Sequence, residues 1–262
     1  MAETSPLRIR QALVGGGQHP AVVPYLMAGF PRLQDTVGLL LAAQRAGAAA
    51  AELGLPYSDP LADGPVIQAA GQQALANGVT VKIGLAQVAE ARAAGFGLPL
   101  VLMTYLNPLL RMGLMAFAES AVASGVDGVL VPDLPLEEMS GLREAAARFG
   151  LAVNTMVAPT TPDPRIRRAA ELSTGFVYCV SRTGVTGSGS AETDEGRALL
   201  LRARAQTDLP LALGFGVRRR EQVLALSGLA DAVVVGSLLL EKAGMATDPA
   251  RAVAEAIAEL RP

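Results

Sequence analysis

The chain has 262 residues, of which 51% are hydrophobic, and carries a formal net charge of −2 at pH 7. Positive and negative residues are interspersed, which argues against a nucleic-acid-binding surface. A single cysteine, Cys179, excludes an intramolecular disulfide, and a single histidine, His19, leaves no His/Cys metal cluster. We therefore expect no metal site, and any acid or base catalyst should be Asp, Glu, Tyr or Lys.

No apolar run is long enough to cross a bilayer. The richest stretch, residues 37–55, is interrupted by Gln44, Arg45 and Glu52. The N-terminus lacks the apolar core of a secretory signal peptide. These features predict a cytoplasmic protein that does not associate with membranes.

Short apolar runs alternate with longer amphipathic runs along the chain. The short runs predict strands at residues 21–27, 50–55, 98–105, 128–131, 152–157, 175–180, 211–215 and 232–235. The amphipathic runs include predicted helices at residues 35–46, 82–93, 114–123, 136–148 and 221–227. This alternation, over a length close to the ~250 residues typical of the fold, predicts one α/β domain, a (β/α)₈ TIM barrel spanning residues 1–262. A doubly wound open sheet shares the alternation, but no Gly-x-Gly-x-x-Gly motif follows the first strand.

Two acids follow each other at the end of the second predicted strand. Barrel enzymes place their active sites at the C-terminal ends of the strands. Glu52 lies inside this apolar strand, where an ionised carboxylate without a partner is costly, although a structural ion pair is an alternative interpretation. Asp63 lies on the following loop, in an Asp-Gly pair that is also common in turns. Together the two carboxyl groups could take separate roles set by separate environments.

Glycines follow the last three predicted strands. They occur within residues 181–187 and 214–217, and at Gly236, where Ser237 begins a helix. A helix N-terminus offers free N–H groups and a partial positive charge to an anion. Any one of these glycines is most simply a turn residue, but three successive glycine-bearing loops favour a phosphate site. The substrate is therefore expected to be a small phosphorylated molecule.

Tyr178 and Cys179 are adjacent in the sixth predicted strand. A tyrosine there is either a core residue with a satisfied hydroxyl or a pocket residue at the barrel mouth, and the pattern leaves both open. Cys179 is expected to be a small buried hydrophobic residue.

Seven segments resemble one known family in the family's own order. The longest, residues 52–68, reads ELGLPYSDPLADGPVIQ and closely resembles the signature of tryptophan synthase alpha subunits. The resemblance continues through residues 24–31, 103–108, 131–135, 158–162, 178–187 and 214–216. These segments span most of the chain.

The resemblance implies a carbon–carbon lyase of tryptophan biosynthesis. Members cleave indole-3-glycerol phosphate to indole and glyceraldehyde 3-phosphate in a retro-aldol reaction. The family assembles as an α₂β₂ heterotetramer with allosteric coupling between the subunits. It has no metal or organic cofactor in this subunit, since pyridoxal phosphate belongs to the beta partner.

The resemblance also implies roles for individual residues. Glu52 resembles the catalytic acid/base, and Asp63 resembles the acid that addresses the indole ring nitrogen. Four residues are expected at the substrate: Tyr105, Tyr178, Thr186 and Phe215. Four are expected at the phosphate: Gly187, Gly216, Gly236 and Ser237. Pro56 and Asp59 are expected to face the beta subunit.

Three other functions stay open at this point. A stand-alone indole-3-glycerol-phosphate lyase would share all these residues. Another phosphate-binding barrel, such as an isomerase or an indole-glycerol-phosphate synthase, is disfavoured by the loop that joins Glu52 to Asp63. A non-catalytic activating subunit is disfavoured by the presence of both acids and the phosphate loops.

Overall fold

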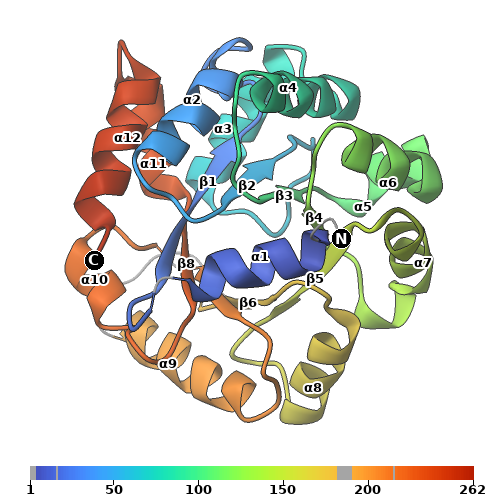
Figure 1. The fold of residues 1–262 in the computed structure, drawn as a ribbon, viewed down its shortest axis with the longest axis vertical. Coiled ribbons are helices and arrows are strands. Elements are labelled where there is room, and N and C mark those ends of the chain that lie inside the picture. Colours follow the sequence, from blue (N-terminus) through green and yellow to red (C-terminus); the bar gives the residue numbers. More distant parts are fainter. Residues whose placement is uncertain (1–3, 16, 182–190, 215) are drawn as a thin grey trace.

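The computed structural model describes residues 4–15, 17–181, 191–214 and 216–262. Eight parallel strands pair in chain order, and the eighth pairs with the first to close a barrel (Figure 1). The strands are β1 (Ala21–Met27), β2 (Ala51–Gly54), β3 (Leu100–Met103), β4 (Gly128–Leu130), β5 (Ala152–Val157), β6 (Val177–Val180), β7 (Leu211–Gly214) and β8 (Ala232–Val235).

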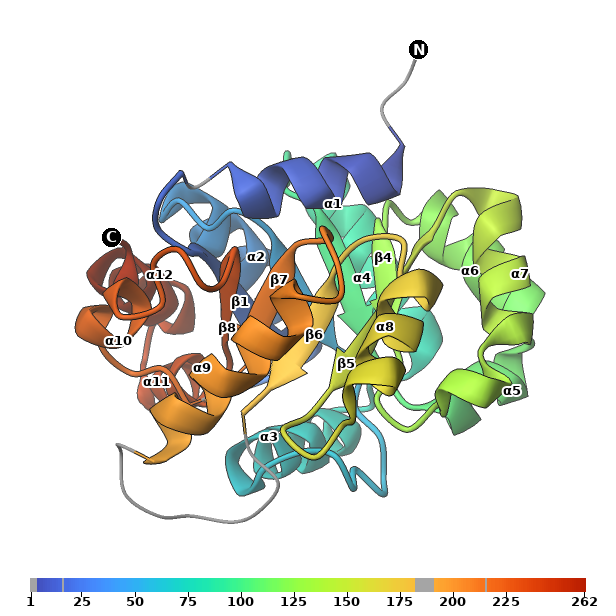
Figure 2. The same ribbon diagram turned by 90° about the horizontal axis from the view of Figure 1, so that it is seen from below.

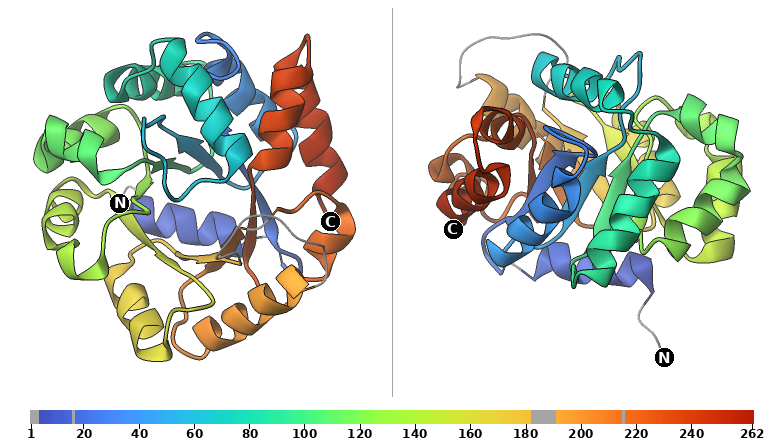
Figure 3. Two further views of the ribbon diagram at one scale, coloured as in Figure 1. Left: turned by 180° about the vertical axis from the view of Figure 1, so that it is seen from behind. Right: turned by 90° about the horizontal axis from the view of Figure 1, so that it is seen from above.

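Helices surround this barrel, as Figure 3 shows from behind and from above. They are α1 (Ser5–Val14), α2 (Asp35–Arg45), α3 (Pro65–Ala76), α4 (Val81–Ala93), α5 (Leu106–Met112), α6 (Leu114–Ala123), α7 (Ser140–Phe149), α8 (Asp163–Leu172), α9 (Ala191–Arg204), α10 (Arg220–Leu224), α11 (Ser237–Met245) and α12 (Pro249–Leu260). A short 3₁₀ helix, η1 (Leu136–Glu138), precedes α7. Within the described ranges, no helix is long and apolar enough to span a membrane.

The structure confirms the predicted barrel and its eight strands. The bounds of β1, β5 and β8 match the prediction at both ends, whereas β3 is shorter than predicted. It ends at Met103 because Tyr105 already takes the N-cap position of α5.

Two predicted helices were wrong in extent. The helix predicted at residues 136–148 is divided, because Glu138 N–H bonds to Pro135 O at 2.9 Å in the tighter 3₁₀ pattern before α7 begins. The helix predicted at residues 221–227 ends at Leu224, whose carbonyl accepts a hydrogen bond from the Ser227 hydroxyl at 2.7 Å. Such side-chain bonds to backbone carbonyls compete with helix propagation.

Strand register decides which side chains share the inside of the barrel. Tyr25 of β1 is paired with Glu52 of β2, and Glu52 is paired with Val101 of β3. Side chains at paired positions of parallel strands point to the same face, and residues two apart along a strand do so as well. Tyr25, Glu52 and Gly54 therefore all face inward.

Helix α1 lies across the N-terminal end of the barrel (Figure 2). Arg8 of α1 bonds to Asp127 at 2.6 Å, and Arg92 bonds to the other oxygen of the same carboxylate at 2.8 Å. Asp127 also accepts a hydrogen bond from the Leu100 N–H at 2.9 Å, so this nearly buried carboxylate is well partnered. These contacts hold α1 over the barrel, and the opposite, C-terminal end carries the candidate site.

Candidate functional site

A cavity of about 180 Å³ opens at the C-terminal end of the barrel. It is lined from β1, β3, β5, β6, β7 and β8, from the loops that follow β2, β7 and β8, and from the first turns of α3 and α11. Its walls are formed by Tyr25, Ala62, Asp63, Ile67, Met103, Met156, Tyr178, Val180, Gly214, Gly216, Val217, Val234, Gly236 and Ser237. The structure thus brings Asp63 and Tyr178 together with three of the four positions expected at a phosphate.

Glu52 lies on the inner face of β2 with only 2% of its surface exposed. Neither carboxylate oxygen has a hydrogen-bond partner among the described residues. Burial, and to a smaller extent the charge of Asp63, raise the pKa of Glu52 to about 8. The alternative interpretation of a structural ion pair is not supported within the described part of the chain, because no cation contacts this carboxylate there.

Asp63 is half-buried on the loop between β2 and α3. The loop is held at both sides of this residue: Ala62 N–H bonds to the Tyr105 hydroxyl at 3.0 Å, and the Gln68 side chain bonds to the Asp63 carbonyl at 2.8 Å. Burial raises the pKa of Asp63 to about 6, and a hydrogen bond with Tyr105 opposes this rise.

The two carboxyl groups therefore differ in protonation near neutral pH. A pKa of about 8 keeps Glu52 mainly protonated, and a pKa of about 6 leaves Asp63 mainly ionised. Glu52 can thus supply a proton while Asp63 stabilises a positive charge. Two carboxyl groups with different protonation states are the arrangement expected of an acid/base pair.

Two tyrosines reach the inside of the barrel through space left by glycines. A Cβ atom built on Gly214 would lie 2.1 Å from the Tyr178 hydroxyl, so only glycine leaves room for it. Gly54 leaves the same space for the hydroxyl of Tyr25. Burial and the charges of the nearby acids raise the pKa of both tyrosines, so both are neutral hydrogen-bond donors.

Tyr25 is a pocket residue that sequence reasoning missed. The signal was its place two residues before the end of β1, opposite Glu52 in register, which becomes visible only once the strands are paired. Tyr105, by contrast, was expected near the substrate and lies beside Asp63. Its ring stacks on Tyr57 with centroids 5.1 Å apart.

The opposite side of the cavity suits an anion. Gly236 is the N-cap of α11, and Ser237 is its first residue, so their N–H groups belong to a helix start. Both line the cavity together with Gly216, where an added Cβ would meet nothing within 4 Å. Three further residues expected at the site fall outside the described residues: Thr186, Gly187 and Phe215.

The two positions expected at a partner interface lie on the loop that carries Asp63. Pro56 is half-buried, whereas Asp59 is exposed and accepts a hydrogen bond from Ser58. Leu61, between Asp59 and Asp63, leaves 93% of its surface exposed.

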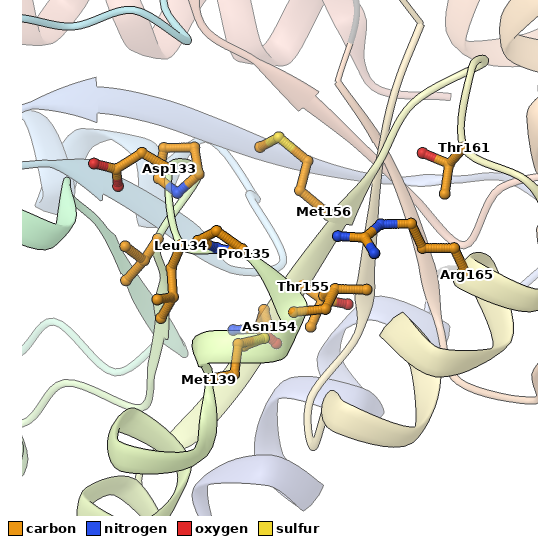
Figure 4. A pocket seen from close by; sticks show the side chains of 12 residues that line it. Asp133, Leu134, Pro135, Met139, Asn154, Thr155, Met156, Thr161 and Arg165 are labelled. Carbon is orange, nitrogen blue, oxygen red and sulfur yellow. The ribbon is translucent and has the colours of Figure 1, made fainter.

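A neighbouring cavity of about 320 Å³ shares Met156 with the first (Figure 4). Its charged groups already have partners: Arg165 pairs with Glu137, and Asp133 accepts a hydrogen bond from Leu106 N–H at 2.9 Å. The unpartnered carboxylate of Glu52 lies in the barrel beneath the first cavity, which is therefore the better candidate for chemistry.

Comparisons with known proteins agree with this geometry. The family described as "Tryptophan synthase alpha chain" matches residues 15–261. The tryptophan synthase alpha chain of Chloroflexus aurantiacus is 45% identical over 222 residues, which cover 85% of this chain and 84% of that protein. That of Alkalilimnicola ehrlichii is 44% identical over 245 residues, covering 92% and 89%.

Solved structures show the same fold. The alpha subunit from Legionella pneumophila superposes with a TM-score of 0.88 at 32% identity, covering 99% of this chain and 98% of that one. A chain of the Pyrococcus furiosus tryptophan synthase a2b2 complex superposes with a TM-score of 0.84 at 38% identity, covering 93% and 98%. This chain belongs to the tryptophan synthase alpha chain family.

Proposed function

We propose that this chain is the alpha subunit of a tryptophan synthase and cleaves indole-3-glycerol phosphate to indole and glyceraldehyde 3-phosphate. The observation that carries the proposal is the pair of carboxyl groups at one end of the barrel. Glu52 is buried there without a hydrogen-bond partner among the described residues, and Asp63 lines the cavity at the mouth. A helix N-terminus lines the other side of the same cavity, where it can bind a phosphate.

The reaction begins with protonation of the indole ring. The bond between ring carbon C3 and the glycerol chain cannot break directly, because the indole anion is a poor leaving group. Protonated Glu52 delivers its proton to C3, and positive charge then develops on the ring N–H. Ionised Asp63 stabilises that charge, which is the role its lower pKa allows.

The second step uses the carboxylate that the first step leaves behind. Glu52 removes the proton from the chain hydroxyl next to the ring, and that oxygen becomes the aldehyde of glyceraldehyde 3-phosphate. The carbon–carbon bond breaks, its electron pair returns to the ring, and neutral indole is released with Glu52 protonated again. General acid–base catalysis of this kind contributes about 10²–10⁴-fold to rate.

Binding energy from the phosphate positions the reacting bond. We place the phosphate at Gly216, Gly236 and Ser237, with Gly187 completing the set. Tyr105, Tyr178, Thr186 and Phe215 are placed around the rest of the substrate. Because these contacts lie away from the reacting bond, they fix orientation without changing the chemistry itself.

A beta subunit is the expected partner. The Pyrococcus furiosus relative belongs to a tryptophan synthase a2b2 complex that shows mutual activation. In this chain the loop with Pro56 and Asp59 also carries Asp63, so docking there would act directly on the position of a catalytic acid. Indole is small and apolar, and a docked partner that consumes it would prevent its loss.

A spectroscopic assay of indole release tests the proposal. We expect slow release from indole-3-glycerol phosphate by the isolated chain and faster release once a cognate beta subunit is bound. Allosteric couplings are typically about 1–3 kcal/mol, so the increase should be roughly 5- to 150-fold. No indole release in either case would refute the proposal. Equal rates, with the complex shown to form, would favour a stand-alone lyase.

A further inference from the structure

Tyr25 lies between the acidic side of the cavity and the side that we propose for the phosphate. It lines the cavity, has only 4% of its surface exposed and is paired in register with Glu52. No role for it follows from the two-step reaction described above. Its position nonetheless places a neutral hydroxyl inside the substrate site.

The hydroxyl end of Tyr25 lies over β2. A Cβ atom built on Gly54 would be 2.1 Å from the Tyr25 hydroxyl oxygen and 2.7 Å from the carbon that bears it. Gly54 follows Glu52 by two residues on the same inner face of the strand. The hydroxyl therefore lies two residues further along the inner face of β2 than Glu52, toward the mouth of the barrel.

The other end of Tyr25 lies against the helix start proposed for the phosphate. A Cβ atom built on Gly236 would be 3.3 Å from Cδ1 and 3.4 Å from Cβ of Tyr25. Gly236 is the N-cap of α11. The tyrosine side chain thus runs from the phosphate position toward the catalytic acid.

The substrate has a group that matches this intermediate position. Its phosphate is at one end of the glycerol chain, and the hydroxyl that Glu52 deprotonates is at the other, next to the ring. The hydroxyl on the central carbon lies between them. We propose that Tyr25 is a further substrate-positioning residue, whose hydroxyl donates a hydrogen bond to this central hydroxyl of the glycerol chain.

Such a bond would align the chain for cleavage. With the phosphate and the central hydroxyl both held, rotation about the chain is restricted and the reacting hydroxyl is directed to Glu52. Burial and the neighbouring carboxylates raise the pKa of Tyr25, which keeps its hydroxyl in the donor form over the whole neutral range. This inference rests on the proposed function, because it assigns a further contact to the same substrate.

The test compares two substrates in Tyr25→Phe: indole-3-glycerol phosphate and its analogue without the central hydroxyl. For a neutral hydrogen bond we expect kcat/KM of the full substrate to fall about 2- to 10-fold, with no further loss on the analogue. Equal losses on both substrates, or an unchanged kcat/KM on the full substrate, would overturn the inference. Thermal unfolding of the variant checks that the barrel is intact.

Tyr178→Phe is the matched control. Tyr178 also reaches into the barrel over a glycine, Gly214, but from β6, which is three strands away from β1. The loss of kcat/KM in Tyr178→Phe should be the same for both substrates. If the loss of kcat/KM depended on the central hydroxyl in Tyr178→Phe and not in Tyr25→Phe, the contact would belong to Tyr178. That result would refute the inference.

A binding measurement separates this inference from the proposed function. Glycerol 3-phosphate carries the central hydroxyl, and the monophosphate of 1,3-propanediol lacks it. Tyr25→Phe should weaken binding of the first about 2- to 10-fold and leave the second unchanged. Equal changes for the two ligands would refute the inference even where indole release is normal, whereas a wild-type chain that releases no indole would refute the proposed function itself.

Discussion

The Tyr105 hydroxyl accepts a hydrogen bond from the backbone N–H of Ala62 at 3.0 Å, one residue before Asp63. The same hydroxyl opposes the rise that burial causes in the pKa of Asp63. Tyr105 is the N-cap of α5, so this contact joins the loop after β2 to the start of the helix that follows β3. One hydroxyl therefore both fixes the loop and helps to keep the proposed catalytic carboxylate ionised.

Tyr105→Phe should raise the pKa of Asp63, because burial then acts without the opposing hydrogen bond. The acidic limb of the kcat/KM profile should move to higher pH. At pH 6 we expect a loss of about 2- to 10-fold, the effect of one hydrogen bond, and a smaller loss at pH 7.5. The measurement is kcat/KM for indole release between pH 5 and 9.

Tyr57→Phe is the control for this change. Tyr57 stacks on Tyr105, but its own hydroxyl accepts a hydrogen bond from the Asn107 side chain at 2.8 Å instead of acting on Asp63. The acidic limb of the kcat/KM profile of Tyr57→Phe should lie at the same pH as in the wild type. An unmoved limb in Tyr105→Phe would show that the hydroxyl does not control the ionisation of Asp63.

The pH profile of the wild type should be bell-shaped. The proposed mechanism requires ionised Asp63 and protonated Glu52, so activity should rise with an apparent pKa of about 6 and fall with one of about 8. Because the two groups interact, these values belong to the pair. A flat profile between pH 6 and 8 would contradict the assigned protonation states.

Glu52→Gln and Asp63→Asn should each reduce kcat by at least about 10²-fold, the low end for loss of a general acid or base. Both changes are nearly isosteric, so folding should survive, and circular dichroism is the check. Near-normal turnover in Glu52→Gln would remove the mechanism, because the described residues lining the cavity include no other carboxyl group but Asp63.

Stability should also depend on pH through Glu52. Its pKa is raised from 4.5 to about 8 in the folded chain, so between these values the folded state binds more protons than the unfolded state. The free energy of unfolding contributed by this group is fully present below pH 4.5 and decreases as the pH rises to 8. The decrease is on the order of 4 kcal/mol.

Glu52→Gln should remove this decrease. The variant should gain stability relative to the wild type at pH 8 and lose that advantage at pH 4.5, in urea unfolding at both values. Asp63→Asn is the comparison. Its effect on the free energy of unfolding should be smaller and confined to a lower pH range, because the pKa of Asp63 is raised only to about 6. If the free energy of unfolding depended on pH equally in the wild type and in Glu52→Gln, folding would not raise the pKa of Glu52.

The sequence was sufficient to predict the barrel and to place Glu52 inside one of its strands. Alternating apolar and amphipathic runs predict eight strands, and Glu52 stands out as a charge inside one of them. Tyr25 could not be identified in this way, because its position depends on the register of β1 with β2 and on the space above Gly54. Neither pairing nor side-chain space is visible in the periodicity of a single strand.

Local interactions explain the errors in the helices. The residues from Leu136 onward have the apolar spacing of one continuous helix, but a single i→i+3 hydrogen bond to Pro135 starts a separate 3₁₀ turn. Helix ends depend on such individual bonds, whose energies are small compared with the burial that determines the helix as a whole.

Gly216→Val tests the proposed phosphate position. An added Cβ at Gly216 meets nothing within 4 Å, so the larger side chain should fit the fold and extend into the cavity. Hydrogen bonds to a charged group are worth enough that glycerol 3-phosphate should bind at least about 10-fold more weakly by calorimetry, with indole affinity changed less. Gly38→Ala in α2, which also meets nothing within 4 Å, should leave both affinities unchanged. Equal losses for the two ligands in Gly216→Val would place the phosphate elsewhere.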